Sequence, residues 1–325
     1  MATGRTTTTQ VTDAVNNMLS LPLLERAYPH FVHTLWGSVR PLSRNQSTTI
    51  KFRRYTSLSA ATTALTEGVT PDATQVAITD LTATPLQYGA YVEATDYLDM
   101  TTLDPYKVEI AGLLGDQMGD TFDQLTRDVI TAGSTVQYAS TATSRVTVAA
   151  GMLLTGDEIR EAVRTLQGQN AKPITEIVNP SDGFNTSPIQ AGYIGIISED
   201  THFDLKNDPR WTPVAEYAQP ESRLGSYEVG SLDEVRFVLA GSNAKVAAAG
   251  GAGSIDVHLT VIMGRGYYGI TQITGEAVEV ITKPLGSGGT SDPLNQIQTM
   301  GWKGTFVAKR LNENFVVRVE HAVSS

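Results

Sequence analysis

The glycine-rich segment 264–269, GRGYYG, comes nearest in this sequence to a nucleotide-binding motif. It fits the G-x-G-x-x-G pattern and follows a predicted strand, DVHLTVIM. A dinucleotide site needs a helix next, because the N-terminus of that helix faces the pyrophosphate. The residues that follow, GITQITGEAVEV, are β-branched, glycine-punctuated and without a helical period. The segment therefore predicts a bulged strand or a tight turn and not a phosphate site.

The five histidines offer little scope for metal binding or acid–base chemistry. His30 and His33 have the H-x-x-H spacing with which two histidines on a helix can share a metal ion. Pro29 interrupts this segment and no third ligand lies nearby in the sequence, so a metal site is not favoured. The other histidines are isolated, and we expect them at the surface or packed in the interior: His202, His258 and His321.

Three aspartates, Asp116, Asp120 and Asp123, fall on one face of a predicted helix. Clustered carboxylate oxygens can bind a divalent cation. A solvated acidic helix face is the simpler interpretation, and it is the one we expect.

The densest basic patch contains Arg44, Lys51, Arg53 and Arg54. Together with Tyr55 these residues could contact nucleic acid. They lie in a predicted ribbon that is otherwise poor in charge, so pairing with acidic groups of a neighbouring subunit is the favoured interpretation.

The motifs of the common catalytic classes are missing from this sequence. It contains no G-x-S-x-G, H-E-x-x-H or G-x-x-x-x-G-K-[ST] pattern and no paired catalytic carboxylates. The absence of cysteine excludes disulfides, thiolate zinc sites, iron–sulfur clusters and a cysteine nucleophile. We therefore expect that the protein is not an enzyme, and we expect no catalytic, cofactor-binding or metal-binding residues.

The charge balance argues against tight binding of nucleic acid. The 325 residues carry a formal net charge of -10, from 24 Lys and Arg and 34 Asp and Glu. Release of DNA counterions requires clustered basic residues, which are scarce here. Charged residues make up 18% of the chain, against roughly 25% in an ordinary soluble domain. No run of about 18 apolar residues is present, so no membrane-spanning helix is expected.

The first hundred residues predict an arm followed by a long hairpin. Residues 1–47 are polar and then interrupted by prolines, which favours an arm lying on a neighbouring surface. TTIKFRRYTSL alternates as a strand does, TEGVTPD predicts a turn, and QVAITDLTATPLQYGAYVEATDYL predicts returning strands. This hairpin, residues 48–100, has few large apolar residues in its middle. Because a two-stranded ribbon is marginal alone in water, it must lie on another subunit.

The rest of the chain predicts an α+β fold with few helices. Residues 104–132 form the strongest predicted helix, with an N-cap at Asp104-Pro105 and an apolar stripe: Leu114, Met118, Phe122, Leu125 and Val129. A second helix is expected over residues 155–169, and KPITEIVNP, residues 172–180, predicts a short buried strand. Residues 181–226 are expected to mix helix and loop, and residues 241–254 to form a small-residue loop. Strands are expected in the remainder, with a turn at residues 312–314.

This order of elements resembles the major capsid proteins of tailed double-stranded DNA bacteriophages. VRPLSRNQSTTIKFRRYTSLSAATTALTEGVTP is similar to the extended-loop signature of a podophage-type branch. SDPLNQIQTMGWKGTFVAKRLNENFVVRVE resembles the C-terminal signature of that branch, with Asp292-Pro293-Leu294, Gly301-Trp302-Lys303 and Asn312. DVITAGSTVQYA and ITEIVNPSDGF are also similar.

The resemblance implies a domain plan for the chain. Residues 1–47 would be an N-terminal arm and 48–100 an extended loop. Residues 101–150 and 276–325 would form a peripheral domain with the spine helix 104–132, and residues 151–275 an axial domain. Phe122 and Trp302 are expected to pack in the peripheral domain. Lys51, Arg53, Arg54 and Glu67 of the extended loop are candidates for inter-subunit contacts.

The resemblance also implies a function. The protein would assemble into hexamers and pentamers of an icosahedral shell that encloses double-stranded DNA without sequence-specific binding. Its partners would be further copies of itself, a portal protein, a scaffolding protein and a decoration or cement protein, in a virion assembled in the host bacterial cytoplasm. Some relatives cross-link subunits through lysine, but we expect no cross-link here. The alternative is a cellular encapsulin-type shell protein of the same fold.

Overall fold

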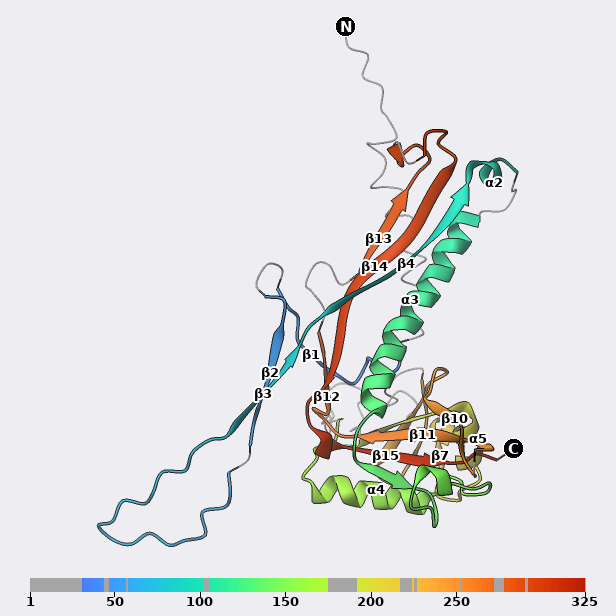
Figure 1. Cartoon of the computed structure of the whole chain (residues 1–325). Coiled ribbons are helices and arrows are strands. Elements are labelled where there is room, and N and C mark those ends of the chain that lie inside the picture. Colours follow the sequence, from blue (N-terminus) through green and yellow to red (C-terminus); the bar gives the residue numbers. More distant parts are fainter. Residues whose placement is uncertain are drawn as a thin grey trace, which may run out of the picture.

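A computed structural model describes residues 31–43, 47–56, 58–101, 106–174, 192–216, 224, 227–251, 253–271, 278–289 and 292–324. Figure 1 shows three parts: a projecting hairpin, an elongated sheet with a long helix beside it, and a lobe at one end of that helix. The predictions for residues 1–30, Arg44, the N-cap at residues 104–105 and residues 175–180 of the predicted strand 172–180 lie outside the described residues.

The predicted hairpin is confirmed at its base. Strand β2 (Ile50–Tyr55) pairs antiparallel with β3 (Ile78–Ala83), in the register Phe52 to Leu81 and Arg53 to Asp80. Phe52 is 5% exposed because it packs against Gly269 of the body, where a Cβ atom would lie 2.7 Å from the Phe52 ring. Phe52 thus helps to anchor the hairpin to the rest of the chain.

The elongated part is a five-stranded sheet. Its central strand, β14 (Ile297–Arg310), pairs antiparallel with strands on both sides. The strands that complete the sheet are β4 (Leu86–Thr95), β13 (Val278–Lys283), β12 (Tyr268–Thr271) and β1 (Ser38–Val39). The side chains of β14 alternate between two faces, and the face carrying Met300, Trp302 and Phe306 is buried.

A short helix, α2 (Asp96–Thr101), stands where the sequence predicts further strand. Pairing of β4 with β14 ends at Thr95 opposite Ile297, so the chain has no partner strand beyond this point. The Thr95 hydroxyl oxygen accepts a hydrogen bond from the Leu98 backbone N–H at 3.4 Å, as a helix cap does. Loss of the partner strand and this local cap explain the difference.

The predicted long helix is confirmed as α3 (Tyr106–Thr131). Leu114, Met118 and Phe122 are buried against the sheet, while Leu125 and Val129 pack on the core more loosely. Among the described residues, no helix has both the length and the hydrophobicity needed to cross a membrane.

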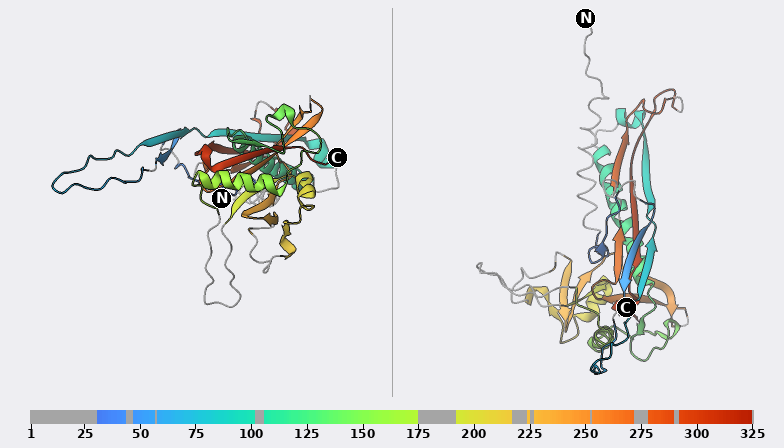
Figure 2. Two further views of the ribbon diagram at one scale, coloured as in Figure 1. Left: turned by 90° about the horizontal axis from the view of Figure 1, so that it is seen from below. Right: turned by 90° about the vertical axis from the view of Figure 1, so that its left-hand side faces the viewer.

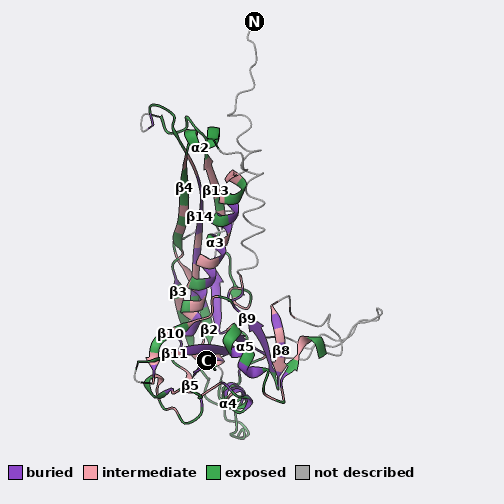
Figure 3. Ribbon diagram, turned by 90° about the vertical axis from the view of Figure 1, so that its right-hand side faces the viewer, coloured by how far each residue is buried: buried purple, intermediate pink, exposed green. Residues whose placement is uncertain are grey.

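The lobe is built on an eight-stranded sheet in the order β5-β15-β11-β6-β9-β8-β7, with β10 on β11. Its strands are β5 (Val136–Tyr138), β6 (Tyr193–Ile197), β7 (Thr212–Pro213), β8 (Glu228–Leu232), β9 (Val235–Leu239), β10 (Lys245–Gly250), β11 (Ile255–Met263) and β15 (Val316–His321). Its helices are α4 (Gly156–Gly168), α5 (Glu199–Leu205) and the short 3-10 helices Arg145–Thr147, Val214–Glu216 and Glu313–Phe315. The second helix predicted from sequence, residues 155–169, is thereby confirmed as α4. Figure 3 shows that much of this sheet is buried, whereas α2 at the far end of the molecule is exposed.

Two predictions for the lobe were wrong. β6 was missed in the stretch expected to be helix and loop, because five apolar or small residues in a row have no period that marks a strand. The small-residue loop predicted over 241–254 contains strand β10, which pairs with β11 across a register shift. Ala and Gly have low strand propensity, and only the free edge of β11 makes this segment extended.

One hydrophobic core joins the elongated part to the lobe. The largest core cluster contains Met118 and Phe122 of α3, Trp302 of β14, and Ile194 and Met263 of the lobe strands. Residues 276–325 contribute to both sheets, since β14 lies in the five-stranded sheet and β15 in the eight-stranded one. The junction around the C-terminal end of α3 is therefore packed and not a flexible linker.

Candidate functional site

The most unusual surface of the molecule is the ribbon, which we define as residues 58–77, between β2 and β3. Every residue of the ribbon is exposed, and none of its length is regular strand. It carries large apolar side chains that face solvent, such as Leu65 at 78% exposure and Val69 at 63%. Figure 2 shows the ribbon extending away from the rest of the chain. Glu67 lies at its turn, next to Gly68, whose φ of +79° suits glycine.

The four predicted contact residues of the hairpin have different surroundings within one chain. Lys51 is exposed, and so is Glu67 at the ribbon turn. Arg53 forms an ion pair with Asp80 on the paired strand, with Nε 3.0 Å from Oδ1. This arginine holds the pKa of the Asp80 carboxyl below its usual range. Arg54 donates a hydrogen bond of 2.9 Å to the amide oxygen of Asn312.

A cleft of about 530 Å³ lies where the hairpin meets the body. We call it the hinge cleft. The hairpin contributes one wall, and the segments before β2, after α4 and between β14 and β15 contribute the other. Its described lining residues are Ser38, Arg40, Phe52, Arg53, Arg54, Tyr55, Thr56, Leu81, Gln169, Asn170, Gly266, Leu311, Asn312, Asn314 and Phe315. Arg40 belongs to this cleft, and sequence reasoning missed it, because the residue lies outside the hairpin.

Phe122 and Trp302, the two predicted packing residues, are in contact. They are 2% and 3% exposed, and their ring centroids lie 5.5 Å apart with the rings edge to face. Phe306 also packs on Phe122, with ring centroids 5.0 Å apart. This aromatic cluster fixes α3 on the sheet.

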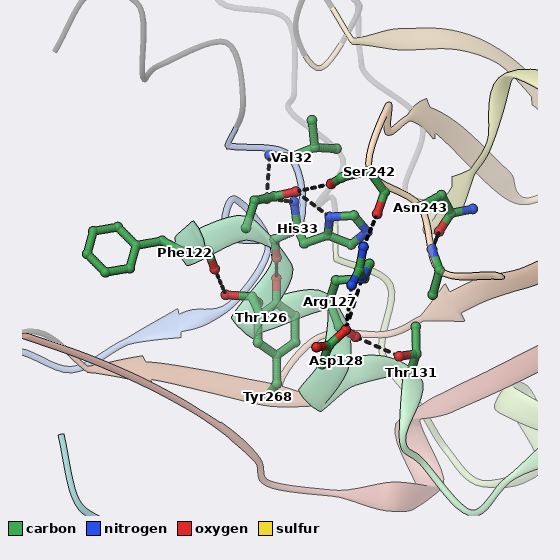
Figure 4. A network of polar contacts seen from close by, with 12 residues as sticks. Val32, His33, Phe122, Thr126, Arg127, Asp128, Thr131, Ser242, Asn243 and Tyr268 are labelled. Atoms are coloured by element: carbon green, nitrogen blue, oxygen red, sulfur yellow. Dashed lines mark hydrogen bonds and ion pairs between the residues drawn. The ribbon is translucent and has the colours of Figure 1, made fainter. Parts of the chain in front are cut away.

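The acidic face predicted for the long helix is interrupted by Asp123, which is 1% exposed. Its Oδ2 lies 2.6 Å from Nδ1 of His33, and its Oδ1 accepts the backbone N–H groups of Val32 and His33 at 2.9 and 2.7 Å. The Ser242 hydroxyl donates a further bond of 3.1 Å to Oδ2. The prediction of a solvated face was therefore wrong for Asp123. Figure 4 shows Val32, His33 and Ser242 meeting at α3.

His33 is thus a buried structural residue that ties the segment before β1 to α3. The other histidine of the H-x-x-H spacing, His30, lies outside the described residues. Nothing in the local sequence of His33 indicates the contact, because 90 residues separate it from Asp123. Among the residues that the structure describes, no group of three or more His, Asp or Glu side chains is placed to hold a metal ion.

The GRGYYG segment forms a turn between β11 and β12, as its sequence predicts, with φ of +80° at Gly266. Its tyrosines are buried and serve the same junction. The Tyr267 hydroxyl donates a hydrogen bond of 2.6 Å to the carbonyl of Ile130, and the Tyr268 hydroxyl donates one to the carbonyl of His33. Burial raises the pKa of both phenols. The two tyrosines therefore connect this turn to α3, through Ile130, and to the arm, through His33.

Comparison with known sequences gives no match, either among protein-family models or among curated proteins. Comparison with solved structures gives several matches of nearly full length. The capsid protein of Ralstonia phage GP4 aligns with a TM-score of 0.73 at 12% identity, over 90% of this chain and 89% of that chain. The cyanophage Pam1 capsid aligns with a TM-score of 0.63 at 15% identity, over 92% of each chain.

A third match, the mature capsid of bacteriophage PhiM1, has a TM-score of 0.56 and 15% identity, over 88% of this chain and 86% of that chain. At these identities the likeness concerns the fold. Because it covers about nine tenths of this chain in each case, it concerns most of the architecture and not one common motif. The chain has the fold of the major capsid proteins of tailed bacteriophages.

Proposed function

We propose that this protein is the major capsid protein of a tailed bacteriophage, a structural and non-enzymatic protein. Copies of it assemble into hexamers and pentamers, which form an icosahedral shell around double-stranded DNA. The observation that carries the proposal is the ribbon, in which all 20 consecutive residues are exposed within the chain. Such a segment gains stability only against another molecule. The matched folds come from capsids, where many copies of one chain meet.

The parts of the molecule correspond to the domain plan of that family. We assign the hairpin and ribbon as the extended loop, α3 as the spine helix, the elongated sheet as the peripheral domain and the lobe as the axial domain. The arm of residues 1–47 completes the plan. The continuous core at the C-terminal end of α3 supports the idea that the two domains act as one subunit.

The charge of the chain supports a container role. A net charge of -10 disfavours tight binding to packed DNA, so the genome is enclosed without sequence-specific contacts. We place the protein in the virion, assembled in the host cytoplasm, with a portal protein and a scaffolding protein as partners and a decoration protein on the outer face. Lys51, Arg53, Arg54 and Glu67 remain our candidates for contacts between subunits. The cellular encapsulin-type alternative is not favoured, since the matches reported above are phage capsids.

Electron microscopy of the purified, overexpressed protein tests the proposal, with light scattering alongside. We expect round shells, or rings of five and six copies. If only monomers are found, candidate scaffolding proteins encoded by the same genome are co-expressed. Monomers that persist with every scaffold would contradict the proposed function.

A further inference from the structure

The hinge cleft carries an excess of positive charge that acidic groups of the described chain do not fully neutralise. Its described lining contains three arginines, Arg40, Arg53 and Arg54, and no carboxylate. Arg53 is neutralised from outside the cleft by Asp80. Arg54 contacts only the neutral amide of Asn312, and Arg40 lies 5.8 Å from the centroid of the Phe52 ring. Two guanidinium charges are therefore left without an acidic partner within the part of the chain that is described.

Guanidinium groups have a specific preference for planar oxyanions. Their N–H donors match the two oxygens of a carboxylate, which makes such pairs directional as well as attractive. Arg40 comes from the body and Arg54 from the hairpin, so one acidic ligand between them would connect the two walls of the cleft. The neutral side chains around them, Ser38, Gln169 and Asn314, offer further hydrogen-bonding groups.

The complementary charge is found at the end of the ribbon. Residues 58–77 contain two carboxylates, Glu67 and Asp72, and no lysine or arginine. Both are exposed, and they flank the turn at Gly68. No ion pair with either side chain forms among the described residues. The ribbon thus has an acidic tip whose carboxylates form no ion pair within the described part of their own subunit.

The tip cannot reach the hinge cleft of its own chain. Ten residues on each side of the ribbon span roughly 30 Å when extended. The ribbon points away from the base of the hairpin, where the cleft lies (Figure 1). The carboxylates must therefore meet the cleft of a second copy. A contact between different surfaces of identical chains runs head to tail, and it closes into a ring when the rotation allows.

We propose that Glu67 and Asp72 at the ribbon tip of one copy dock into the hinge cleft of the next copy, on Arg40 and Arg54. This inference rests on the proposed function, because it requires that copies form rings. It names the contact that links successive copies and adds Arg40 to the candidate residues. Arg53 takes no part in this contact, because it is already paired with Asp80. The docked carboxylates also hold the neighbour's hairpin against its body.

Charge reversal in the full-length protein tests this contact. In the first variant, E67R and D72R are combined, which makes both surfaces basic. In the second, R40E and R54E are combined, which makes both acidic. Each variant alone replaces attraction by repulsion, and we expect at least roughly tenfold weaker assembly by light scattering. The variant with all four changes restores attraction and should form rings and shells again.

Mixing the two double variants gives the sharpest outcome. The basic tip of the first fits the acidic cleft of the second, and the acidic tip of the second fits the basic cleft of the first. Rings can then close only when the two variants alternate, so rings of six copies are expected and rings of five are not. Electron microscopy with class averaging distinguishes them.

The controls separate a failed contact from a failed fold. R164E reverses an exposed charge on α4 and should assemble as the wild type does, and circular dichroism should show every variant folded. If both double variants assemble normally, the contact is wrong while the proposed function stands. If the tip variant assembles and the cleft variant does not, the cleft binds another anion, such as DNA phosphate, and the inference is overturned. If the wild type itself forms no rings with any scaffold, the proposed function fails first.

Discussion

The Oδ2 atom of Asp123 lies 2.6 Å from Nδ1 of His33, and both side chains are 1% exposed. One carboxylate thereby connects the segment before β1 to the middle of the long helix, and through Ser242 to the lobe. A buried carboxylate is tolerated only when its oxygens are well hydrogen-bonded, and here four donors serve the two oxygens. The contact between the segment before β1, α3 and the lobe therefore depends on Asp123.

Replacing Asp123 by Ala should destabilise the subunit by about 3–5 kcal/mol, because it leaves four buried donors without an acceptor. Asp123→Asn keeps the shape and one acceptor oxygen and should cost less. Urea unfolding of the unassembled subunit measures both. Asp128→Asn is the matched control, since its side chain is 66% exposed, and it should change stability by no more than about 1 kcal/mol. Equal stability of the Asp123 and Asp128 variants would contradict this assignment.

Trp302→Ala should cost about 3–5 kcal/mol, because it removes a buried ring that packs on Phe122. Tyr91→Ala on the exposed face of the same sheet is the control, since Tyr91 is 68% exposed and its loss should be small. Chemical denaturation of both variants measures the difference. A Trp302→Ala variant that unfolds like the wild type would show that the aromatic cluster is not needed to hold α3.

Acid should weaken the lobe through its buried histidines. Burial lowers the pKa of His258 and lowers that of His321 to about 4. The folded state therefore holds both rings neutral, while the unfolded chain takes up protons near pH 6.5. The stabilisation is complete above pH 6.5 and is lost as the pH falls toward 4, by up to about 3 kcal/mol for His321.

Thermal unfolding between pH 7.5 and 4 measures this dependence. His321→Gln removes the titrating group, so its melting temperature should fall less steeply over that range, although it starts lower. The ring of His321 is hydrogen-bonded to Thr260 and to the carbonyl of Ala322, which explains the lower starting point. Parallel pH profiles for the wild type and the variant would refute a role for His321.

Replacing the ribbon, residues 58–77, by a short glycine–serine linker should leave the subunit folded. Its free energy of unfolding should change by no more than about 0.5 kcal/mol, because all of these residues are exposed within the chain. Shell formation should be lost, as seen by electron microscopy. Normal shells from this variant would remove the argument that the ribbon is an assembly element.

Local patterns in the sequence were enough to predict the elements whose residues repeat with a regular period. The alternation of IKFRRY predicts β2, and the apolar stripe from Leu114 to Val129 predicts α3, because each pattern matches the period of one backbone conformation. The turn at Glu67 and Gly68 and the exposure of the ribbon follow from composition in the same way. Arg54 and Glu67, which have no ion-pair partner among the described residues, could be predicted as contact residues because they are charged residues in a hairpin without a core of its own.

Tertiary structure alone decided the contacts between distant segments. The sequence does not show that Asp123 is buried and contacts His33 while other aspartates of the helix are not buried. The two residues become neighbours only when the arm crosses α3. Arg40 and Arg54 line one cleft only because the base of the hairpin lies beside the body. β10 is a strand only because β11 offers it an edge. The sequence by itself determined the segments whose pattern has one clear period, such as β2 and α3, and the exposed ribbon. Packing decided strands such as β6 and β10, and it decided which polar groups are buried together, because burial depends on neighbours that no local pattern specifies.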